Sequence, residues 1–350
     1  MSIARSVRGR ALPALLSVLL LAVAGCAGAG GTPSPAAASP SGSIAAAASA
    51  SPTLAPAPTF PLSLTDDAGT AVTLPAVPHR VVSLTPAATE TAFALGDGSR
   101  IVGVVQDVTP YPAAVKSLPV VATYQGADIE KIVGLRPDLV LAGGADFNKP
   151  SDIAKLRSLG IPVLVVSAKD VPGVLADVAL EATALGESAR GAELAASMQA
   201  RMDAITAAAS ASGPKPRVFY ELDATNQLFG PAPDSFVTGL ITAGGGDPIT
   251  SGQAGVYSIS LEKLVAADPQ VIVLGDADYG ATAAQVAKRP GWEGMSAVKD
   301  GAIRPVDDTV VTRPGPRLPD GLRDLALAIH PDLQLPSAAP APTWTSPSTP

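Results

Sequence analysis

The chain of 350 residues has few residues of several types, and each shortage disfavours a class of protein. It contains only two histidines, His79 and His330, and each lies beside a proline. A site for a bare zinc or manganese ion needs several histidines with acidic residues at closing distance, so no such metal site is expected. A Ser-His-Asp hydrolase is also disfavoured, because neither histidine lies in a strand-end loop near a plausible nucleophile.

Positive charge and cysteine are scarce as well. The 24 lysines and arginines stand against 31 acidic residues, which gives a net charge of −7. Nucleic acid is therefore not expected as a partner, because binding to phosphates needs a basic face. The only cysteine, Cys26, can form no disulfide within the chain. No phosphate-binding loop or dinucleotide fingerprint occurs, since the glycine triplet at 244–246 follows a predicted helix rather than a strand.

The first 25 residues have the pattern of a signal peptide. Three arginines within the first ten residues precede an apolar run from 11 to 24. This run is shorter than the ~20 residues that a membrane-spanning helix needs. The following Val23-Ala24-Gly25-Cys26 resembles the lipobox of bacterial lipoproteins, which implies cleavage before Cys26 and attachment of a lipid to its sulfur. The alternative is an inert small residue after an ordinary secretory signal.

Composition divides the rest of the chain. Residues 26–59 are almost entirely Ala, Ser, Pro, Gly and Thr, which predicts a disordered tether, and 336–350 predict a disordered tail of the same kind. The roughly 270 residues between them are more than one core usually covers, so two domains are expected. We predict an N-terminal α/β lobe at 60–186, an interlobe helix at 187–211 and a C-terminal α/β lobe at 212–335.

One segment of the sequence occurs twice. Residues 129–141 recur as 261–273, and each copy predicts a short amphipathic helix, a proline-containing turn and a buried strand. The copies start roughly 130 residues apart, about the size of a small domain. Two similar lobes are the simplest explanation, each with one surface glutamate at the same place, Glu130 and Glu262.

The predicted elements alternate between strands and helices, after a hairpin at 60–74. This order favours mostly parallel sheets flanked by helices in both lobes, an α/β fold. The Ala-rich segment between the lobes should form one long helix, because its apolar residues follow helical spacing. Such a stiff connection predicts a small hinge motion. The predicted strands are 80–84, 101–105, 139–142, 163–167, 217–222, 271–274 and 302–306, and the predicted helices are 88–95, 129–135, 153–159, 235–243, 261–266, 282–287 and 318–329.

Several of these segments together resemble the cobalamin and iron-siderophore branch of bacterial solute-binding proteins, in which a single backbone helix joins two lobes. The resemblance covers 79–331. It is carried by 78–90 with 94–96, by Tyr124-Gln125-Gly126 with 129–132, by 135–140, and by Arg313-Pro314-Gly315-Pro316-Arg317.

The resemblance implies binding rather than catalysis. A cobalt or iron chelate would lie between the lobes of a monomer, with no other cofactor, and an ABC permease dimer with its ATPase would import it. It also implies that one glutamate per lobe pairs with permease arginines, and by motif position these are Glu130 and Glu262. Helical spacing independently turns Glu130 outward, because Ile129, Ile132 and Val133 of the same helix are expected to point inward. The alternative is an ordinary solvated helix face.

Ligands of open α/β sheets bind at the carboxyl ends of strands, so the loops after Leu84, Val105, Leu222 and Leu274 are candidates. In the N-terminal lobe this selects Thr85, Tyr111 and Tyr124. By the resemblance, Tyr124 occupies the position of an aromatic residue that lies against the corrin in cobalamin-binding relatives. Packing support is the alternative interpretation of Tyr124.

The C-terminal lobe offers four candidates: Tyr257, Trp292, Arg313 and Arg317. An arginine can hold carboxylate or phosphate oxygens of an anionic chelate in pairs. The Pro-rich segment around both arginines can equally fix the start of the last helix, with Arg317 in a structural ion pair. Trp292 also suits a core position. Two other functions stay open, namely a haem receptor with Tyr257 or Tyr124 as axial ligand, and a surface lipoprotein that senses or displays.

Overall fold

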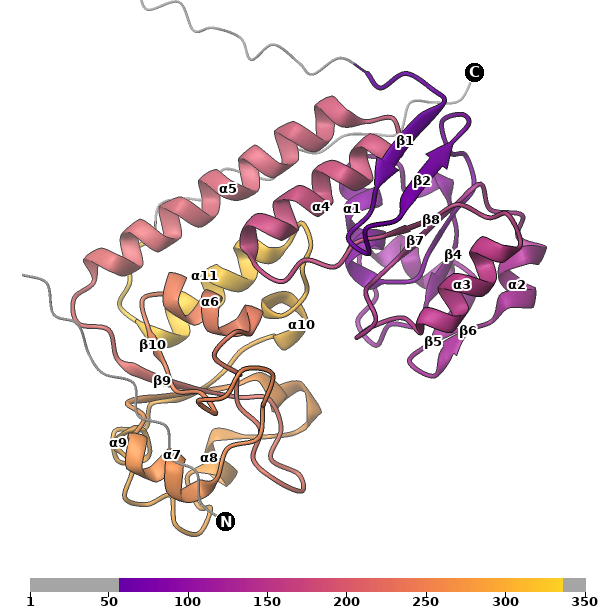
Figure 1. The fold of residues 1–350 in the computed structure, drawn as a ribbon. Coiled ribbons are helices and arrows are strands. Elements are labelled where there is room, and N and C mark those ends of the chain that lie inside the picture. The colour runs from indigo at the N-terminus through magenta and orange to yellow at the C-terminus, as the bar shows by residue number, and fades with distance from the viewer. Residues whose placement is uncertain (1–56, 336–350) are drawn as a thin grey trace, which may run out of the picture. The chain divides into compact units, whose positions relative to one another are not determined.

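The computed structural model describes residues 57–335 (Figure 1). Within this range the chain forms two α/β lobes, each with its own main sheet. The expected signal peptide, Cys26 and the expected tail at 336–350 lie outside the described residues, as does nearly all of the expected tether. Among residues 57–335, no helix is long and apolar enough to cross a membrane.

The N-terminal lobe contains a hairpin and a six-stranded sheet. The sheet order is β6-β5-β4-β3-β7-β8, and all neighbouring strands are parallel except the short edge strand β6. The antiparallel hairpin confirms the one expected at 60–74. The elements are β1 (Leu62–Thr65), β2 (Ala71–Leu74), β3 (Val81–Ser83), α1 (Pro86–Ala94), η1 (Gly98–Arg100), β4 (Ile101–Val105), η2 (Ala113–Ser117), β5 (Val120–Thr123), β6 (Gly126–Ala127), α2 (Ile129–Gly134), β7 (Leu139–Ala142), α3 (Pro150–Ser158), β8 (Val163–Val165) and α4 (Val171–Ala184).

The C-terminal lobe has a smaller, fully parallel sheet in the order β10-β9-β11-β12. This order reproduces β4-β3-β7-β8 of the larger sheet, so the two sheets share a four-stranded plan. After the connecting helix α5 (Ser188–Ala211) come β9 (Arg217–Glu221), α6 (Phe236–Ala243), β10 (Asp247–Pro248), α7 (Leu261–Ala267), β11 (Val271–Leu274), η3 (Gly275–Tyr279), α8 (Ala283–Val286), α9 (Ser296–Lys299), β12 (Ile303–Pro305), α10 (Asp308–Val311) and α11 (Leu318–Ile329).

Helix starts follow local capping chemistry. Asp128 accepts a hydrogen bond from the Lys131 N–H at the start of α2, and Ser260 accepts one from the Lys263 N–H at the start of α7. These bonds satisfy N–H groups that have no partner within the helix. Thr85 caps α1 in the same way. The residue just before each of these helices thereby fixes where the helix begins.

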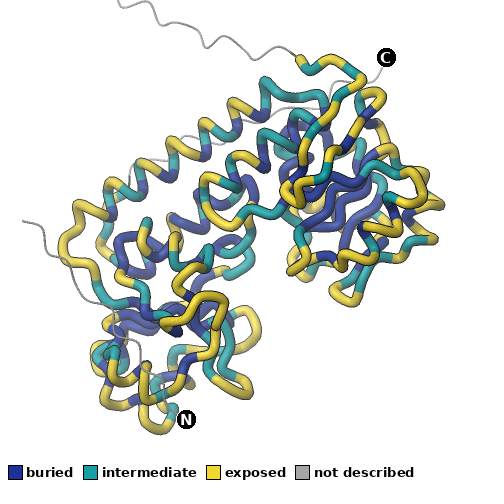
Figure 2. The backbone as a smooth tube through the Cα atoms, in the orientation of Figure 1, coloured by how far each residue is buried: buried dark blue, intermediate teal, exposed yellow. Residues whose placement is uncertain are grey.

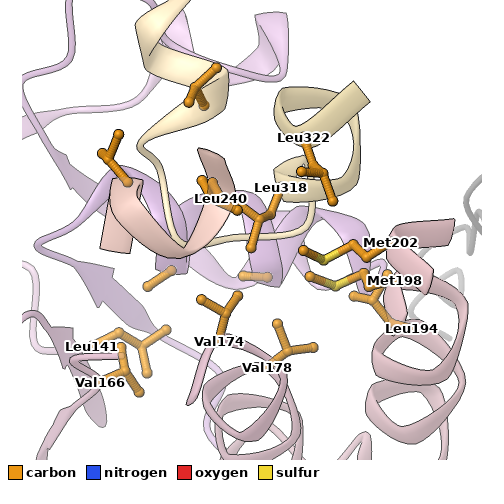
Figure 3. Packing of buried hydrophobic residues seen from close by; sticks show 14 of the residues in the cluster. Leu141, Val166, Val174, Val178, Leu194, Met198, Met202, Leu240, Leu318 and Leu322 are labelled. Carbon is orange, nitrogen blue, oxygen red and sulfur yellow. The ribbon is translucent and has the colours of Figure 1, made fainter. Parts of the chain in front are cut away.

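Helix α5 contacts both lobes, which confirms the expected connecting helix. It packs along α4 of the N-terminal lobe and against α11 of the C-terminal lobe (Figure 1). Figure 3 shows Val174 and Val178 of α4 close to Met198 and Met202 of α5, with Leu318 and Leu322 of α11 nearby. The helical side of the molecule therefore forms one apolar core that both lobes share.

Each lobe also has a core of its own. The other face of the N-terminal sheet packs around Val82, Val140 and Ile132, and that of the C-terminal sheet around Phe219, Ile272 and Trp292. Figure 2 shows the buried strands in each lobe under a mostly exposed outer surface. The lobes are thus separately packed on one side and joined on the other, a tighter connection than one helix alone provides.

The repeated segment has the same local structure twice. In each lobe an arginine at the start of a strand, Arg80 or Arg217, donates from its side-chain nitrogens to a carbonyl at the end of the repeated helix, that of Leu135 or Ala267. The residue after each helix adopts a positive φ although it is not glycine, 48° at Arg136 and 46° at Asp268. The internal repeat in the sequence is therefore also a repeat in backbone geometry.

Candidate functional site

A cleft of about 630 Å³ lies between the lobes. Its walls come from the segments that follow β3, β4, β5, β7 and β8 in the N-terminal lobe, and β11 and β12 in the C-terminal lobe. This is the carboxyl edge of both sheets, where open α/β folds bind ligands. The segment after β9, which was also expected to contribute, is absent from these walls.

Exposed aromatic rings line the cleft from both lobes. Tyr124 is 89% exposed and Phe147 is 53% exposed in the N-terminal lobe, and Tyr279 of the C-terminal lobe is 76% exposed. Aromatic residues make up only 4% of the chain. Large apolar side chains left uncovered together mark a surface that binds something. These three rings can cover the flat face of a large ligand.

The base of the cleft contains two buried carboxyl groups from adjacent turns of α4, Asp177 and Glu181. Asp177 accepts a hydrogen bond from the Ala168 N–H at 2.9 Å. Burial, with the neighbouring Asp67 carboxylate, raises the pKa of Asp177 to about 8. Burial also raises the pKa of Glu181 well above its ordinary value, with Asp177 adding to the effect. Asp177 is therefore mostly protonated at neutral pH, and the protonated form of Glu181 is favoured by the same causes.

A cluster of ion pairs links the lobes beside the cleft. The buried Glu90 carboxylate of α1 accepts from Arg313 Nη1 at 2.6 Å and from Arg317 Nε at 2.8 Å. Arg313 also pairs with Asp107, and the Arg317 guanidinium lies 4.3 Å from the ring centroid of Tyr111. The hydrogen bonds that Arg317 donates to the Glu90 carboxylate raise the pKa of Arg317. Both arginines thus already hold protein carboxylates.

Thr85, Tyr124 and Arg313 of the predicted ligand-binding residues lie in the wall of the cleft. Thr85 is buried, and its hydroxyl is occupied as the cap of α1. Tyr111 and Arg317 stack on each other in the interlobe cluster and are not part of the wall. The structure therefore brings these five residues near one another, with different surroundings for each.

Tyr257 and Trp292 lie elsewhere. Trp292 is 4% exposed and packs in the core of the C-terminal lobe, under the Arg289 guanidinium. Tyr257 is half-exposed, and its carbonyl accepts from the Gly230 N–H, away from the residues that line the cleft. We leave both out of the proposed binding site. Among residues 57–335, no group of three or more His, Cys, Asp or Glu side chains could hold a metal ion.

Glu130 and Glu262 occupy matching positions in the first turn of α2 and of α7, and both are exposed. The Glu262 backbone N–H and the Ser260 hydroxyl hold the pKa of Glu262 below its ordinary value, so this carboxylate is charged at neutral pH. Each lobe consequently presents an exposed acidic side chain at the start of an equivalent helix. Val133 of α2 was expected to point inward but is 42% exposed, because the six-residue helix buries only Ile132.

Sequence reasoning missed the other two aromatic rings and the two buried acids of the cleft, Phe147, Tyr279, Asp177 and Glu181. The rule that ligands bind at strand ends could have identified the first two, because Phe147 follows β7 and Tyr279 ends the turn after β11. The two acids lie on α4, a helix that was not predicted. Its start, Val171-Pro172-Gly173, has the composition of a turn.

Comparison with known proteins places this architecture in a family. The periplasmic binding protein family matches residues 81–309. This chain belongs to that family. An uncharacterised ABC transporter substrate-binding lipoprotein of Bacillus subtilis is 32% identical over 78% of this chain and 87% of its own. A cobalamin-binding protein of Halobacterium salinarum is 34% identical over 78% of this chain and 75% of its own.

Solved structures agree. The haem-binding protein RhuT of Roseiflexus is 29% identical and superimposes with a TM-score of 0.65 over 72% of this chain and 98% of its own. The vitamin B12-binding protein BtuF of Vibrio cholerae is 25% identical, with a TM-score of 0.62 over 72% of this chain and 97% of its own. The chain is therefore a solute-binding protein of ABC import, which is a binding function and not an enzymatic one. Such a protein works with a permease and a small ligand.

Proposed function

We propose that this protein is an extracytoplasmic lipoprotein that captures a corrinoid in the cleft between its lobes and delivers it to an ABC permease. The observation that carries the proposal is the interlobe cleft, to which both lobes contribute exposed aromatic rings. Its volume of about 630 Å³ is within the range of ~300–1,000 Å³ that ligand pockets occupy. A relative named as a cobalamin-binding protein supports the choice of a corrinoid. A ferric siderophore is the second member of the same ligand class.

Haem is a second candidate, favoured by a specific observation. Tyr124 and Tyr279 extend into the cleft from opposite lobes and are largely exposed, and a phenolate can act as an axial ligand of haem iron. Haem-binding proteins are also among the similar solved structures. A corrinoid and a haem both present a flat macrocycle to aromatic rings, so the rings alone do not discriminate between them.

The membrane attachment and the docking surface are parts of the same proposal. The lipid would be attached to Cys26, outside the described residues, and the tether would let the folded lobes reach the permease. Glu130 and Glu262 would pair with basic residues of the two permease subunits. Their equivalent positions on α2 and α7 support this role, because a two-fold partner suits two equivalent carboxylates.

Thermal unfolding with added ligands tests the cargo. A ligand that binds only the folded state stabilises it, so at 100 times its Kd it should add about 2.7 kcal/mol. We expect cobalamin to raise the melting temperature of the full chain, and haem, a ferric hydroxamate and a ferric catecholate to leave it unchanged. A shift with haem and a change in its Soret band, without a response to cobalamin, would replace corrinoid by haem.

A matched pair of variants tests the location. Tyr124→Ala removes an exposed ring from the cleft, and we expect roughly tenfold weaker cobalamin binding, because stacked aromatic contacts contribute about 1 kcal/mol beyond burial. Tyr257→Ala removes an exposed ring outside the cleft and should leave the Kd unchanged. Equal losses in both variants would place the ligand elsewhere.

A further inference from the structure

Glu181 is a buried carboxyl group with one oxygen that has no hydrogen-bond partner among the described residues. The residue is 3% exposed and lines the cleft, yet its Oε2 atom accepts and donates no hydrogen bond within the described part of the chain. Buried polar atoms are almost always paired, because an unpaired one costs about 1–3 kcal/mol. An unpaired atom in the wall of a binding cleft indicates that a bound molecule supplies the partner.

The charges around Glu181 restrict what that partner can be. Five acidic residues line the cleft, and among the lining residues only Arg313 is basic. The Arg313 guanidinium is already held by the Glu90 and Asp107 carboxylates. A ligand with carboxylates at its edge would therefore bury negative charge without a free cation to pair with, which is costly. An uncharged edge that both donates and accepts hydrogen bonds avoids this cost. The five acidic residues are Asp107, Asp146, Asp177, Glu181 and Asp308.

The carboxyl groups near Glu181 favour its protonated form, which can hydrogen-bond to an uncharged ligand edge. Asp177 lies one turn earlier on α4, and Asp67, from the turn between β1 and β2, faces Asp177. Three carboxyl groups this close cannot all be ionised, and burial further favours the protonated form of Glu181. A protonated carboxyl group donates one hydrogen bond and accepts another. A primary carboxamide has the complementary pair of groups, an N–H donor and a carbonyl acceptor.

We propose that Glu181, supported by Asp177, is a subsite for a primary carboxamide at the edge of the cargo, and that it selects amide-bearing chelates over carboxylate-bearing ones. This inference rests on the proposed function and specifies the ligand further. Corrinoids with carboxamide side chains belong to the preferred class. A porphyrin whose edge carries carboxylates belongs to the disfavoured class.

Equilibrium binding to the full chain, measured by titration calorimetry at pH 7, tests the subsite. The probes are cyanocobalamin and a set of its derivatives in which one peripheral amide at a time is a carboxylate. We expect one derivative to bind the unaltered protein at least roughly tenfold more weakly than cyanocobalamin, since a hydrogen-bonded pair contributes about 1–2 kcal/mol. Glu181→Leu should weaken cyanocobalamin by a similar factor and reduce this discrimination to below about threefold.

Two further variants separate the subsite from general effects. Glu181→Gln keeps a donor and an acceptor at this position, so it should restore affinity to within about threefold of the unaltered protein. Asp97→Asn alters another buried carboxyl group of the same lobe that has an unpartnered oxygen but lies outside the cleft, and it should leave both affinities unchanged.

The outcomes that overturn the proposal differ from those that overturn the proposed function. If cyanocobalamin binds and Glu181→Leu retains both its affinity and the discrimination, the subsite is wrong while corrinoid binding stands; a trapped water would then be the partner of Glu181. If no corrinoid binds the unaltered protein, the proposed cargo is wrong and the subsite falls with it.

Discussion

The two lobes are alike in the repeated segment and unlike where they face the cleft. In both lobes a backbone N–H of the strand-start arginine donates to a side chain just after the repeated turn, from Arg80 to Asp138 at 2.9 Å and from Arg217 to Gln270 at 3.1 Å. The cleft side shows no such correspondence. The N-terminal lobe contributes most of its wall, including both buried acids of α4, whereas the C-terminal lobe contributes Tyr279 and the segment from Asp308 to Pro314.

The fold has to meet two different binding requirements, one for the cargo and one for the permease. An asymmetric cargo needs different contacts from each lobe, so the cleft walls are free to diverge. A partner built from two equivalent subunits needs the same surface twice. The retained geometry around α2 and α7 is what such a partner requires.

Reversing the charge of the matched glutamates on both repeated helices should have the largest effect on function. We expect Glu130→Lys combined with Glu262→Lys to reduce corrinoid uptake by cells to background, because like charges would then face the permease. The Kd for cobalamin, measured on the purified protein, should not change, because neither residue lines the cleft.

A control pair changes the net charge equally at other exposed acids. Glu193→Lys with Glu293→Lys should retain uptake, since these residues do not occupy the repeated positions. Loss of uptake in both pairs would attribute the effect to net charge. Normal uptake in the first pair would remove Glu130 and Glu262 from the docking surface.

The second prediction concerns the ion pairs between Glu90 and the two arginines, which join the lobes beside the cleft. Glu90→Gln should lower the free energy of unfolding by about 3 kcal/mol, because two partly buried arginines lose their shared carboxylate. Chemical denaturation measures this loss. Asp324→Asn provides the comparison, because its pair with Arg323 is about half exposed and should contribute less than ~0.5 kcal/mol. A loss below 1 kcal/mol for Glu90→Gln would show that the cluster does not stabilise the interlobe contact.

The sequence alone predicts the strands of the repeated segment and the last helix well. Strands β7 and β11 and helix α11 have the expected bounds, because continuous apolar runs and helical spacing leave few alternatives. Other elements were missed, among them strand β5. Strands β6 and β10 have two residues each, too short for a periodic signal. Helix α4 begins with Val171-Pro172-Gly173, and only the Asp170 cap and its buried face against α5 make it a helix.

The site follows the same division. Thr85, Tyr124 and Arg313 come from motifs near strand ends, and the structure places them in the cleft wall. The sequence could not show that Arg313 is neutralised by Glu90, because the two residues are distant in the chain and belong to different lobes. The same holds for Glu181, whose acidic character suggests a solvated helix face until α4 is seen packed against α5, α1 and β1. Long-range packing therefore decides the cleft, whereas local pattern decides the repeat.

The third prediction concerns how the stability of the fold depends on pH through Asp177 at the base of the cleft. The folded state holds a proton on Asp177 with a pKa of about 8, against an ordinary value of 3.8, so it binds more protons than the unfolded state between these values. Stability from this group is therefore complete below pH 4 and decreases as the pH rises to about 8. Asp177→Asn cannot ionise and can still meet Asp67 and the Ala168 N–H. Its gain in unfolding free energy over the unaltered protein should grow from pH 5 to pH 8, to on the order of 2 kcal/mol.

Thermal unfolding across this pH range, without ligand, provides the measurement. The corresponding substitution at an exposed cleft acid, Asp146→Asn, should change the melting temperature by the same small amount at every pH. A gain for Asp177→Asn that does not depend on pH would mean that Asp177 is ionised in the fold, and the base of the cleft would then carry charge rather than a proton.

The smallest expected effect tests where the two copies of the repeat differ. Arg136 and Asp268 share a positive φ, a conformation that glycine adopts without the steric cost of a Cβ. The Arg136 side chain is exposed, so Arg136→Gly should leave stability unchanged or raise it by up to ~1 kcal/mol. The Asp268 carboxylate accepts from the backbone N–H and the hydroxyl of Ser296 and pairs with Arg217. Asp268→Gly should therefore lower stability despite the same relief of strain. Equal effects in denaturant titrations would mean that backbone geometry alone determines the stability of both turns. Effects of opposite sign would show that the side-chain contacts of Asp268 stabilise the turn in the C-terminal lobe.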